Sequence, residues 1–171
     1  MNGSQHITDI RVGQGFDIHR FTDDPARVLV LGGVTFEGAQ GLVGHSDADV
    51  IAHACADALL GAAGLGDIGE HFPDTDDRWK GADSLRILEE VSGMVRAQGW
   101  VIGNVDCSVV CETPKLAPHR AAMQDKLSRA AGASISVKGR RAEGLGSLGR
   151  REGIACWASA VIYRIEDRGE I

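Results

Sequence analysis

Three residues in the first third of the chain are of the types that bind metal ions. Asp17 and His19 lie two positions apart in GQGFDIHRF, and His53 follows in DADVIAHACADALLGAA. In an extended strand, residues i and i+2 point to the same face, so Asp17 and His19 would lie side by side. Taken alone, this pair is either a hydrogen-bonded acid and imidazole or two ligands of a site that needs a third.

His53 is the natural third ligand because of the helix in which we expect it. Asp49, His53 and Asp57 are spaced four apart and share one helical face, while their neighbours are apolar. Buried ionisable groups are costly unless they are paired or metal-bound. Two imidazoles and one carboxylate leave an open tetrahedral position, the pattern of a catalytic zinc. Asp49 or Asp57 would then hold the second nitrogen of His53; the alternative is a core histidine satisfied by hydrogen bonds.

Two polar loops flank this helix. In GHSDAD, His45 and Ser46 lie close to the proposed metal, and the simpler interpretation is a helix cap by Ser46 or Asp47. The loop GDIGEHFPDTD contains the acids Asp67, Asp74 and Asp76. Acids near a metal suit a hydroxylated substrate or a second hard cation such as Mg²⁺, whereas a solvated loop is the competing interpretation.

The elements that must position these residues follow from hydrophobic periodicity and from helix start and stop signals. We expect strands at 10–18, 28–36 (a strand pair, or one strand with a Gly-Gly break), 100–112, 134–138 and 154–165, and helices at 47–63, 84–98 and 116–131. This order predicts a single α/β (α+β) domain over residues 1–171, with a mixed sheet packed against helices. Residues 1–9 are expected to be a flexible extension.

Composition narrows the class of protein. The 171 residues carry a net charge of -6, which argues against general nucleic-acid binding. No apolar run approaches the roughly 20 residues of a membrane span, and the N-terminus lacks a secretory signal, so we expect a cytoplasmic protein without a membrane partner. The four cysteines are expected to be buried free thiols. The arginines within residues 138–153 are either a solvated face or a clamp for phosphates.

Several motifs, in order along nearly the whole chain, carry a family resemblance. They are GQGFDIHRF, LGGV, GHSDADVIAHACADALLGAAGLGDIGEHFPDTD, KGADS, NVD, ETPKLAPHRAAM and LGSLGRREGIA. Together they resemble the methylerythritol cyclodiphosphate synthase family of the non-mevalonate isoprenoid pathway. The resemblance implies a homotrimer with active sites between subunits. It also implies conversion of a cytidine-diphospho-methylerythritol phosphate, a small-molecule substrate, into a cyclic diphosphate with release of CMP.

The resemblance also implies roles for individual residues. Zn²⁺ is held by Asp17, His19 and His53, and a second cation, Mg²⁺ or Mn²⁺, meets Glu143 and bridges the phosphates. The flexible-loop residue that stabilises the transition state corresponds to His45. The implied substrate contacts are Ser46, Asp57, Asp67, Ile68, Gly69, Phe72, Pro73, Asp74, Thr75 and Asp76, then Cys111, Glu112, Thr113, Pro114, Lys115, Leu116 and Ala117 around the cytosine, and Arg140, Ala142, Ser147 and Arg150.

The chain departs from the family pattern before Glu143. The usual threonine-rich stretch is replaced by Arg140, Arg141 and Ala142, and Arg141 takes the place of a threonine that contacts the diphosphate in the transition state. We expect an arginine here to supply charge to the phosphates. Two alternatives remain open: another metal-dependent phosphate enzyme, such as a phosphohydrolase, and a weakly active homologue that binds CMP or an isoprenoid diphosphate. The segment ETPKLAP argues against the hydrolase, because small phosphates need no cytosine pocket.

Overall fold

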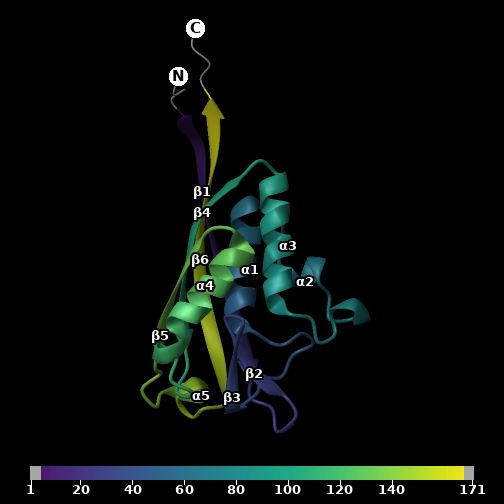
Figure 1. Ribbon diagram of the computed structural model, residues 1–171, viewed down its shortest axis with the longest axis vertical. Coiled ribbons are helices and arrows are strands. Elements are labelled where there is room, and N and C mark those ends of the chain that lie inside the picture. Colours follow the sequence, from purple (N-terminus) through teal and green to yellow (C-terminus); the bar gives the residue numbers. More distant parts are fainter. Residues whose placement is uncertain (1–4, 168–171) are drawn as a thin grey trace.

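The computed structural model describes residues 5–167, in which a four-stranded mixed sheet is covered by helices (Figure 1). The strands in spatial order are β1 (Gln5–Arg20), β6 (Gly153–Asp167), β4 (Val101–Val110) and β5 (Ser134–Arg140). β6 is antiparallel to both of its neighbours, whereas β4 and β5 are parallel. The predicted mixed sheet with packed helices is therefore confirmed.

Three helices form the layer over the sheet. They are α1 (Val50–Ala63), α3 (Ser84–Ala97) and α4 (Arg120–Ala131). α1 packs on β1 and β6, α4 packs on β5, and α3 packs against both of the other helices. The core lies between these layers, and all four cysteines are buried and free, as predicted. None of the helices within residues 5–167 has the length and apolar character of a membrane span.

Shorter elements complete the description of the fold. The strands β2 (Val28–Leu31) and β3 (Val34–Gln40) form a separate hairpin, so of the two alternatives for residues 28–36 the structure has the strand pair. The polar loop at 66–83 contains α2 (Ile68–His71) and the 3₁₀ turn η1 (Asp77–Trp79). A second 3₁₀ turn, η2 (Ala117–His119), precedes α4, and α5 (Gly146–Gly149) lies in the arginine-rich segment.

Most predicted boundaries shift by a few residues; the helix expected at 116–131, for example, begins at Arg120 after the turn η2. Two of the differences have a tertiary cause. The helix expected from residue 47 begins at Val50 and is capped by Asp49, not by Ser46 or Asp47. The Asp49 carboxylate also accepts hydrogen bonds from the backbone N–H groups of Gly32 and Gly33. These contacts with the hairpin hold Asp49 in place as the capping residue. The extension expected over residues 1–9 is strand from Gln5 onward, because it pairs with the end of β6; residues 1–4 lie outside the described part of the chain.

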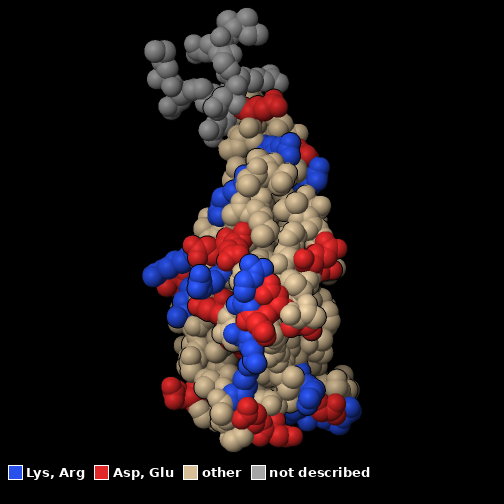
Figure 2. All heavy atoms as spheres, turned by 90° about the vertical axis from the view of Figure 1, so that its right-hand side faces the viewer, with Lys and Arg blue, Asp and Glu red and all other residues tan. Residues whose placement is uncertain are grey.

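The face of the sheet opposite the helices carries exposed apolar side chains. Ile10, Val12, Phe16 and Ile18 of β1 are 45–70% exposed, and Trp157 of β6 is 40% exposed. The Phe16 and Trp157 rings lie 4.8 Å apart. By contrast, the face shown in Figure 2 mixes acidic and basic side chains without a broad patch of either sign.

Candidate active site

Two glycines of β1 allow α1 to approach the strand closely. A Cβ at Gly15 would lie 2.0 Å from the carbonyl oxygen of Ala54, and one at Gly13 would lie 2.0 Å from that of Ala58. Side chains of β1 alternate between faces, so Asp17 and His19 follow Gly13 and Gly15 on the helix side. The close approach therefore brings both residues to His53 on α1.

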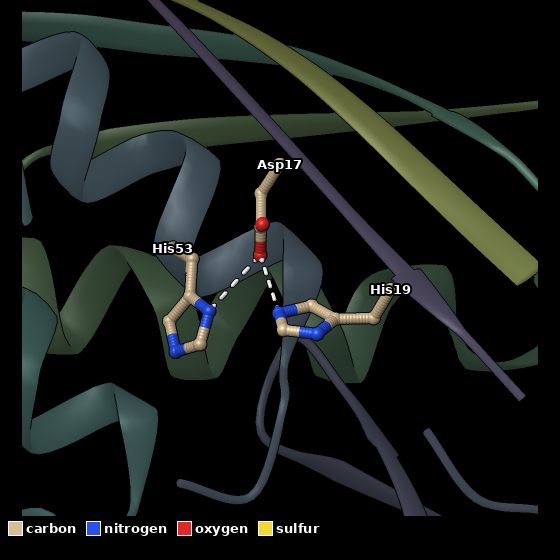
Figure 3. A group of neighbouring side chains, drawn as sticks. All are labelled: Asp17, His19 and His53. Carbon is tan, nitrogen blue, oxygen red and sulfur yellow. Dashed lines mark hydrogen bonds and ion pairs between the residues drawn. The ribbon is translucent and has the colours of Figure 1, made fainter. Parts of the chain in front are cut away.

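The three predicted ligands meet in one place (Figure 3). Asp17 Oδ2 lies 3.1 Å from His19 Nε2 and 3.0 Å from His53 Nδ1. One potential ligand atom from each of the three residues lies within 4.8 Å of the others, and among the residues that the structure describes this is the one group of its kind. The donor set of two imidazole nitrogens and one carboxylate oxygen fits a divalent ion such as zinc.

Charge and burial act in opposite directions on Asp17. Burial raises the pKa of the carboxyl group, but the hydrogen bonds and charges of His19 and His53 outweigh burial and hold the pKa well below its usual range. For His19, burial lowers the pKa, but the hydrogen bond with Asp17 and the charge of Asp17 outweigh burial, so the pKa of His19 is raised. The Asp17 carboxylate is therefore anionic at neutral pH and favours positive charge at this position.

Backbone and hydroxyl groups hold the far sides of both imidazoles. His19 Nδ1 donates to the carbonyl oxygen of Val43 at 2.6 Å, so Nε2 can donate to Asp17 only while the ring is protonated and can offer a lone pair to a metal when the ring is neutral. His53 Nε2 lies 2.8 Å from Ser84 Oγ and 3.1 Å from Ser46 Oγ. Sequence reasoning missed Ser84, which stands at the first position of another helix, where a serine is ordinarily explained by helix capping.

The prediction that Asp49 or Asp57 holds His53 is wrong. Asp49 caps α1 and binds the hairpin glycines. Asp57 accepts the backbone N–H of Ile68 at 2.8 Å, and burial raises the pKa of its carboxyl group. Both carboxylates thus bind backbone groups. The position beside His53 Nε2, where a carboxylate was expected, is occupied by the hydroxyl groups of Ser46 and Ser84.

Arg27 holds the loop that follows the hairpin. Its Nε donates to the carbonyl oxygen of Leu42 at 3.1 Å, and its Nη2 donates to the carbonyl oxygens of Gly44, at 3.0 Å, and Ser46. This loop supplies the carbonyl oxygen of Val43 to His19. Sequence reasoning did not identify Arg27, because nothing in its local sequence links it to a loop about fifteen residues away.

Asp17, His19 and His53 together form what we call the metal-ligand cluster, after their predicted role. A cleft of about 320 Å³ opens at this cluster. Its lining combines the cluster with the polar residues His45, Ser46 and Asp74 and with the apolar residues Ile68, Phe72, Trp79 and Ile87. His45 Nε2 donates to the carbonyl oxygen of Asp76 at 3.2 Å. Trp79 and Ile87 were not predicted. Ile87 reads as an ordinary core residue of an amphipathic helix, so periodicity does not reveal that it faces a cleft.

All of the residues predicted to hold cytosine except Thr113 line a different cavity. This cavity of about 190 Å³ is lined by Cys111, Glu112, Pro114, Lys115, Leu116, Ala117, Arg120, Gly139, Arg140 and Arg141. It shares no lining residue with the cleft at the metal-ligand cluster. Glu143, Ala142, Ser147 and Arg150 line neither of these two cavities, and Glu143 has φ = 52°, in the left-handed region.

Sheet topology explains the separation of the two cavities. Asp17 and His19 lie on β1 and Arg140 lies on β5, and these strands are opposite edges of the sheet. Three spacings of about 4.8 Å place the two edges roughly 14 Å apart. A further cavity of about 560 Å³ lies between the β2–β3 hairpin and residues 22–28, and its lining includes no histidine or cysteine.

Comparison with known proteins places these features in a family context. Residues 10–163 match the YgbB family. A 2-C-methyl-D-erythritol 2,4-cyclodiphosphate synthase of Synechococcus elongatus is 52% identical over 161 residues, which are 92% of this chain and 99% of that protein. The structure titled IspF of Plasmodium falciparum in complex with CDP has a TM-score of 0.78 at 34% identity, over 91% of this chain and 96% of that chain. The bifunctional IspDF of Campylobacter jejuni has a TM-score of 0.87 at 41% identity and covers 93% of this chain, which spans 43% of that longer protein.

Proposed function

The chain belongs to the YgbB family, and from this membership we infer that it is a cyclodiphosphate synthase of the non-mevalonate isoprenoid pathway. It converts 4-diphosphocytidyl-2-C-methyl-D-erythritol 2-phosphate into 2-C-methyl-D-erythritol 2,4-cyclodiphosphate and releases CMP. The observation that carries this conclusion is the near-full-length identity to synthases of that name, at 49–52%. The Asp17, His19 and His53 cluster beside a mixed polar and apolar cleft supports it.

The reaction needs no protein nucleophile. An oxygen of the substrate's 2-phosphate attacks the β-phosphorus, a new P–O–P bond closes the ring, and the bond to the α-phosphate breaks, so that CMP departs. No water is consumed. Both the attacking and the leaving group are anionic, so the protein's main tasks are alignment and charge neutralisation.

The metal-ligand cluster would serve that neutralisation. We propose that Asp17, His19 and His53 hold Zn²⁺, which when bound supplies Lewis acidity toward a phosphate oxygen. Val43 and Ser84 orient the two imidazoles. His45 and Ser46, which line the cleft, would contact the reacting phosphates, and His45 would stabilise the transition state.

The rest of the cleft would bind the methylerythritol part. Ile68 and Phe72 offer apolar contacts in its lining, and Asp74 offers a carboxylate. The neighbouring residues proposed to contact this part are Asp57, Asp67, Gly69, Pro73, Thr75 and Asp76. Bound substrate would exclude water from the apolar side chains and hold its hydroxyl groups toward the acids.

The second cavity would bind the nucleotide. Cys111, Glu112, Thr113, Pro114, Lys115, Leu116 and Ala117 would hold cytosine, largely through backbone groups. Arg140, Arg141, Ala142, Ser147 and Arg150 would lie toward the diphosphate. Glu143 would meet a second cation, Mg²⁺ or Mn²⁺. Because one carboxylate is a single ligand, phosphate oxygens would have to supply most of the others.

We propose a homotrimer in which one chain's metal cluster faces a neighbour's nucleotide cavity. Two observations support shared sites: the two cavities share no residue, and β1 carries apolar side chains on its open face. A contiguous apolar surface of this kind is typical of a protein–protein interface. Cytoplasmic location is likewise proposed, from the soluble substrate.

One incubation tests the function and separates it from hydrolysis. The cytidylated substrate is mixed with protein, Zn²⁺ and Mg²⁺ in ¹⁸O-labelled water, and products are followed by ³¹P NMR and mass spectrometry. The synthase is expected to give CMP and a cyclic diphosphate, both without solvent label. Labelled open-chain phosphate would identify a phosphohydrolase instead, and a bound nucleotide without turnover would identify a binding protein.

A further inference from the structure

A chain of close polar contacts leads from the metal-ligand cluster to Asp47. Asp17 Oδ2 lies 3.0 Å from His53 Nδ1, and His53 Nε2 lies 2.8 Å from Ser84 Oγ. Ser84 Oγ in turn donates to Asp47 Oδ1, and Ser84 N donates to Asp47 Oδ2 at 3.1 Å. Ser84 is fully buried, so no water competes for its hydroxyl group.

The direction of each bond follows from the number of protons available. Both Asp47 oxygens accept backbone N–H groups, Oδ2 from Ser84 and Oδ1 from Asp49 at 3.2 Å, so the carboxylate acts as an acceptor. A hydroxyl group has one proton, and Ser84 gives it to Asp47. Toward His53, Ser84 Oγ can then only accept. The proton therefore resides on His53 Nε2, and the lone pair of the neutral ring is on Nδ1, toward Asp17.

We propose that Asp47 and Ser84 are positioning residues that fix the tautomer of His53 for metal binding. Asp47 sets the direction of the Ser84 hydroxyl, and Ser84 sets the proton on His53. Ser46 is compatible with this order, because its Oγ accepts from Ala48 N at 3.2 Å and can also accept from His53 Nε2, 3.1 Å away, with its own proton left for Ser84 Oγ at 3.4 Å. The inference rests on the proposed metal site but assigns roles to residues outside its ligands.

Substitution of Asp47 by Asn should reverse the hydrogen bond between Ser84 Oγ and residue 47. An amide has one acceptor where the carboxylate has two. If its oxygen keeps the Ser84 N–H group, its NH₂ faces Ser84 Oγ and donates to it. The Ser84 proton then turns toward His53 Nε2, which moves the ring proton to Nδ1 and blocks the ligand atom. The Ser84→Ala variant removes the acceptor instead, and leaves both tautomers available.

The test is zinc affinity, measured by competition with a chromophoric chelator, beside thermal unfolding. Ser84→Ala and Asp47→Asn are each expected to weaken zinc binding about 10–100-fold, the usual range for partners of metal-bound histidines. The double variant should lose little more than the weaker-binding single variant, because both residues act through one proton. Ser92→Ala is the matched control: Ser92 is a buried serine of the same helix whose Oγ has no hydrogen-bond partner among the described residues.

Each outcome bears on one proposal. Zinc affinity unchanged in folded Ser84→Ala, or losses that multiply in the double variant, would overturn the positioning role. A stability loss without an affinity loss would do the same, since a purely structural serine behaves that way. If the unaltered protein binds no zinc, or His53→Ala binds it equally well, the metal site itself is wrong. That result is separate, because it appears before either positioning residue is changed.

Discussion

A substitution at Gly15 would push β1 and α1 apart next to the metal-ligand cluster. In Gly15→Ala, the added Cβ would lie 2.0 Å from the carbonyl oxygen of Ala54 and 2.6 Å from the backbone nitrogen of Ala58. A carbon–oxygen contact normally needs about 3.3 Å, so the helix must move by roughly 1.3 Å at this point. Metal sites tolerate deviations of only about 0.2 Å in ligand distance. Because His53 precedes Ala54, the movement separates it from Asp17.

The variant should therefore lose both stability and metal affinity. Overpacking typically costs about 1–3 kcal/mol, and backbone atoms cannot rotate away as a side chain does, so we expect the upper part of that range. Zinc affinity should fall at least about tenfold, as for other disturbances of ligand orientation. Urea unfolding gives the free energy of unfolding, and chelator competition gives the affinity.

Two glycines provide controls. Gly13→Ala meets the carbonyl oxygen of Ala58 at the same 2.0 Å, but farther from His53, so it should lose similar stability with a smaller loss of affinity. Gly93→Ala, in α3 with nothing within 4 Å of the added Cβ, should gain about 0.5–1 kcal/mol and leave zinc unaffected. Wild-type zinc affinity in folded Gly15→Ala would refute the idea that close packing aligns the ligands.

Four further outcomes are expected. His53→Ala should lose bound zinc and turnover together, measured by metal analysis and CMP release. Arg141→Ala should lower turnover while Arg141→Thr retains or raises it; no change in either would remove this position from the chemistry. Arg27→Lys should lower kcat several-fold with a smaller change in KM, because an ammonium group cannot bond the three carbonyl groups with the fork of a guanidinium. Sedimentation should give about three times the 18.1 kDa chain mass, and an active monomer would contradict the trimer.

The sequence predicted the metal-ligand cluster because each part of it follows from local periodicity. A two-residue spacing places Asp17 and His19 on one strand face, and a helix burying its other residues turns His53 toward them. The hydroxyl groups beside His53 escaped prediction, since Ser84 reaches it from another helix and Ser46 from a loop. Arg27 and Trp79 likewise act through tertiary contacts, which no local pattern encodes.

Asp49 shows how a tertiary contact overrides a correct local pattern. GHSDAD contains several good capping residues, and the local pattern predicted Ser46 or Asp47 as the cap. In the fold, Asp47 is engaged with Ser84, while Asp49 meets the N–H groups of Gly32 and Gly33 as well as those of α1. Asp49, which was predicted as a partner for His53, thus binds the hairpin. Asp47, which was predicted as a cap, contacts His53 through Ser84.

The positions of the two cavities bear on why the open face of the sheet is apolar. The metal-ligand cluster lies on the helix side of β1, whereas Arg140, at the end of β5, lies at the opposite edge of the sheet. In the proposed reaction a diphosphate would contact the metal-ligand cluster and the arginines at once, and roughly 14 Å of sheet between the edges separates the two within one chain. Bringing one chain's β5 edge to another chain's β1 edge removes the obstacle. The exposed Phe16 and Trp157 would then be buried where the sheets meet, which gives the assembly a hydrophobic driving force. On this argument the apolar face and the divided site are two consequences of a single requirement, that neighbouring chains complete the site.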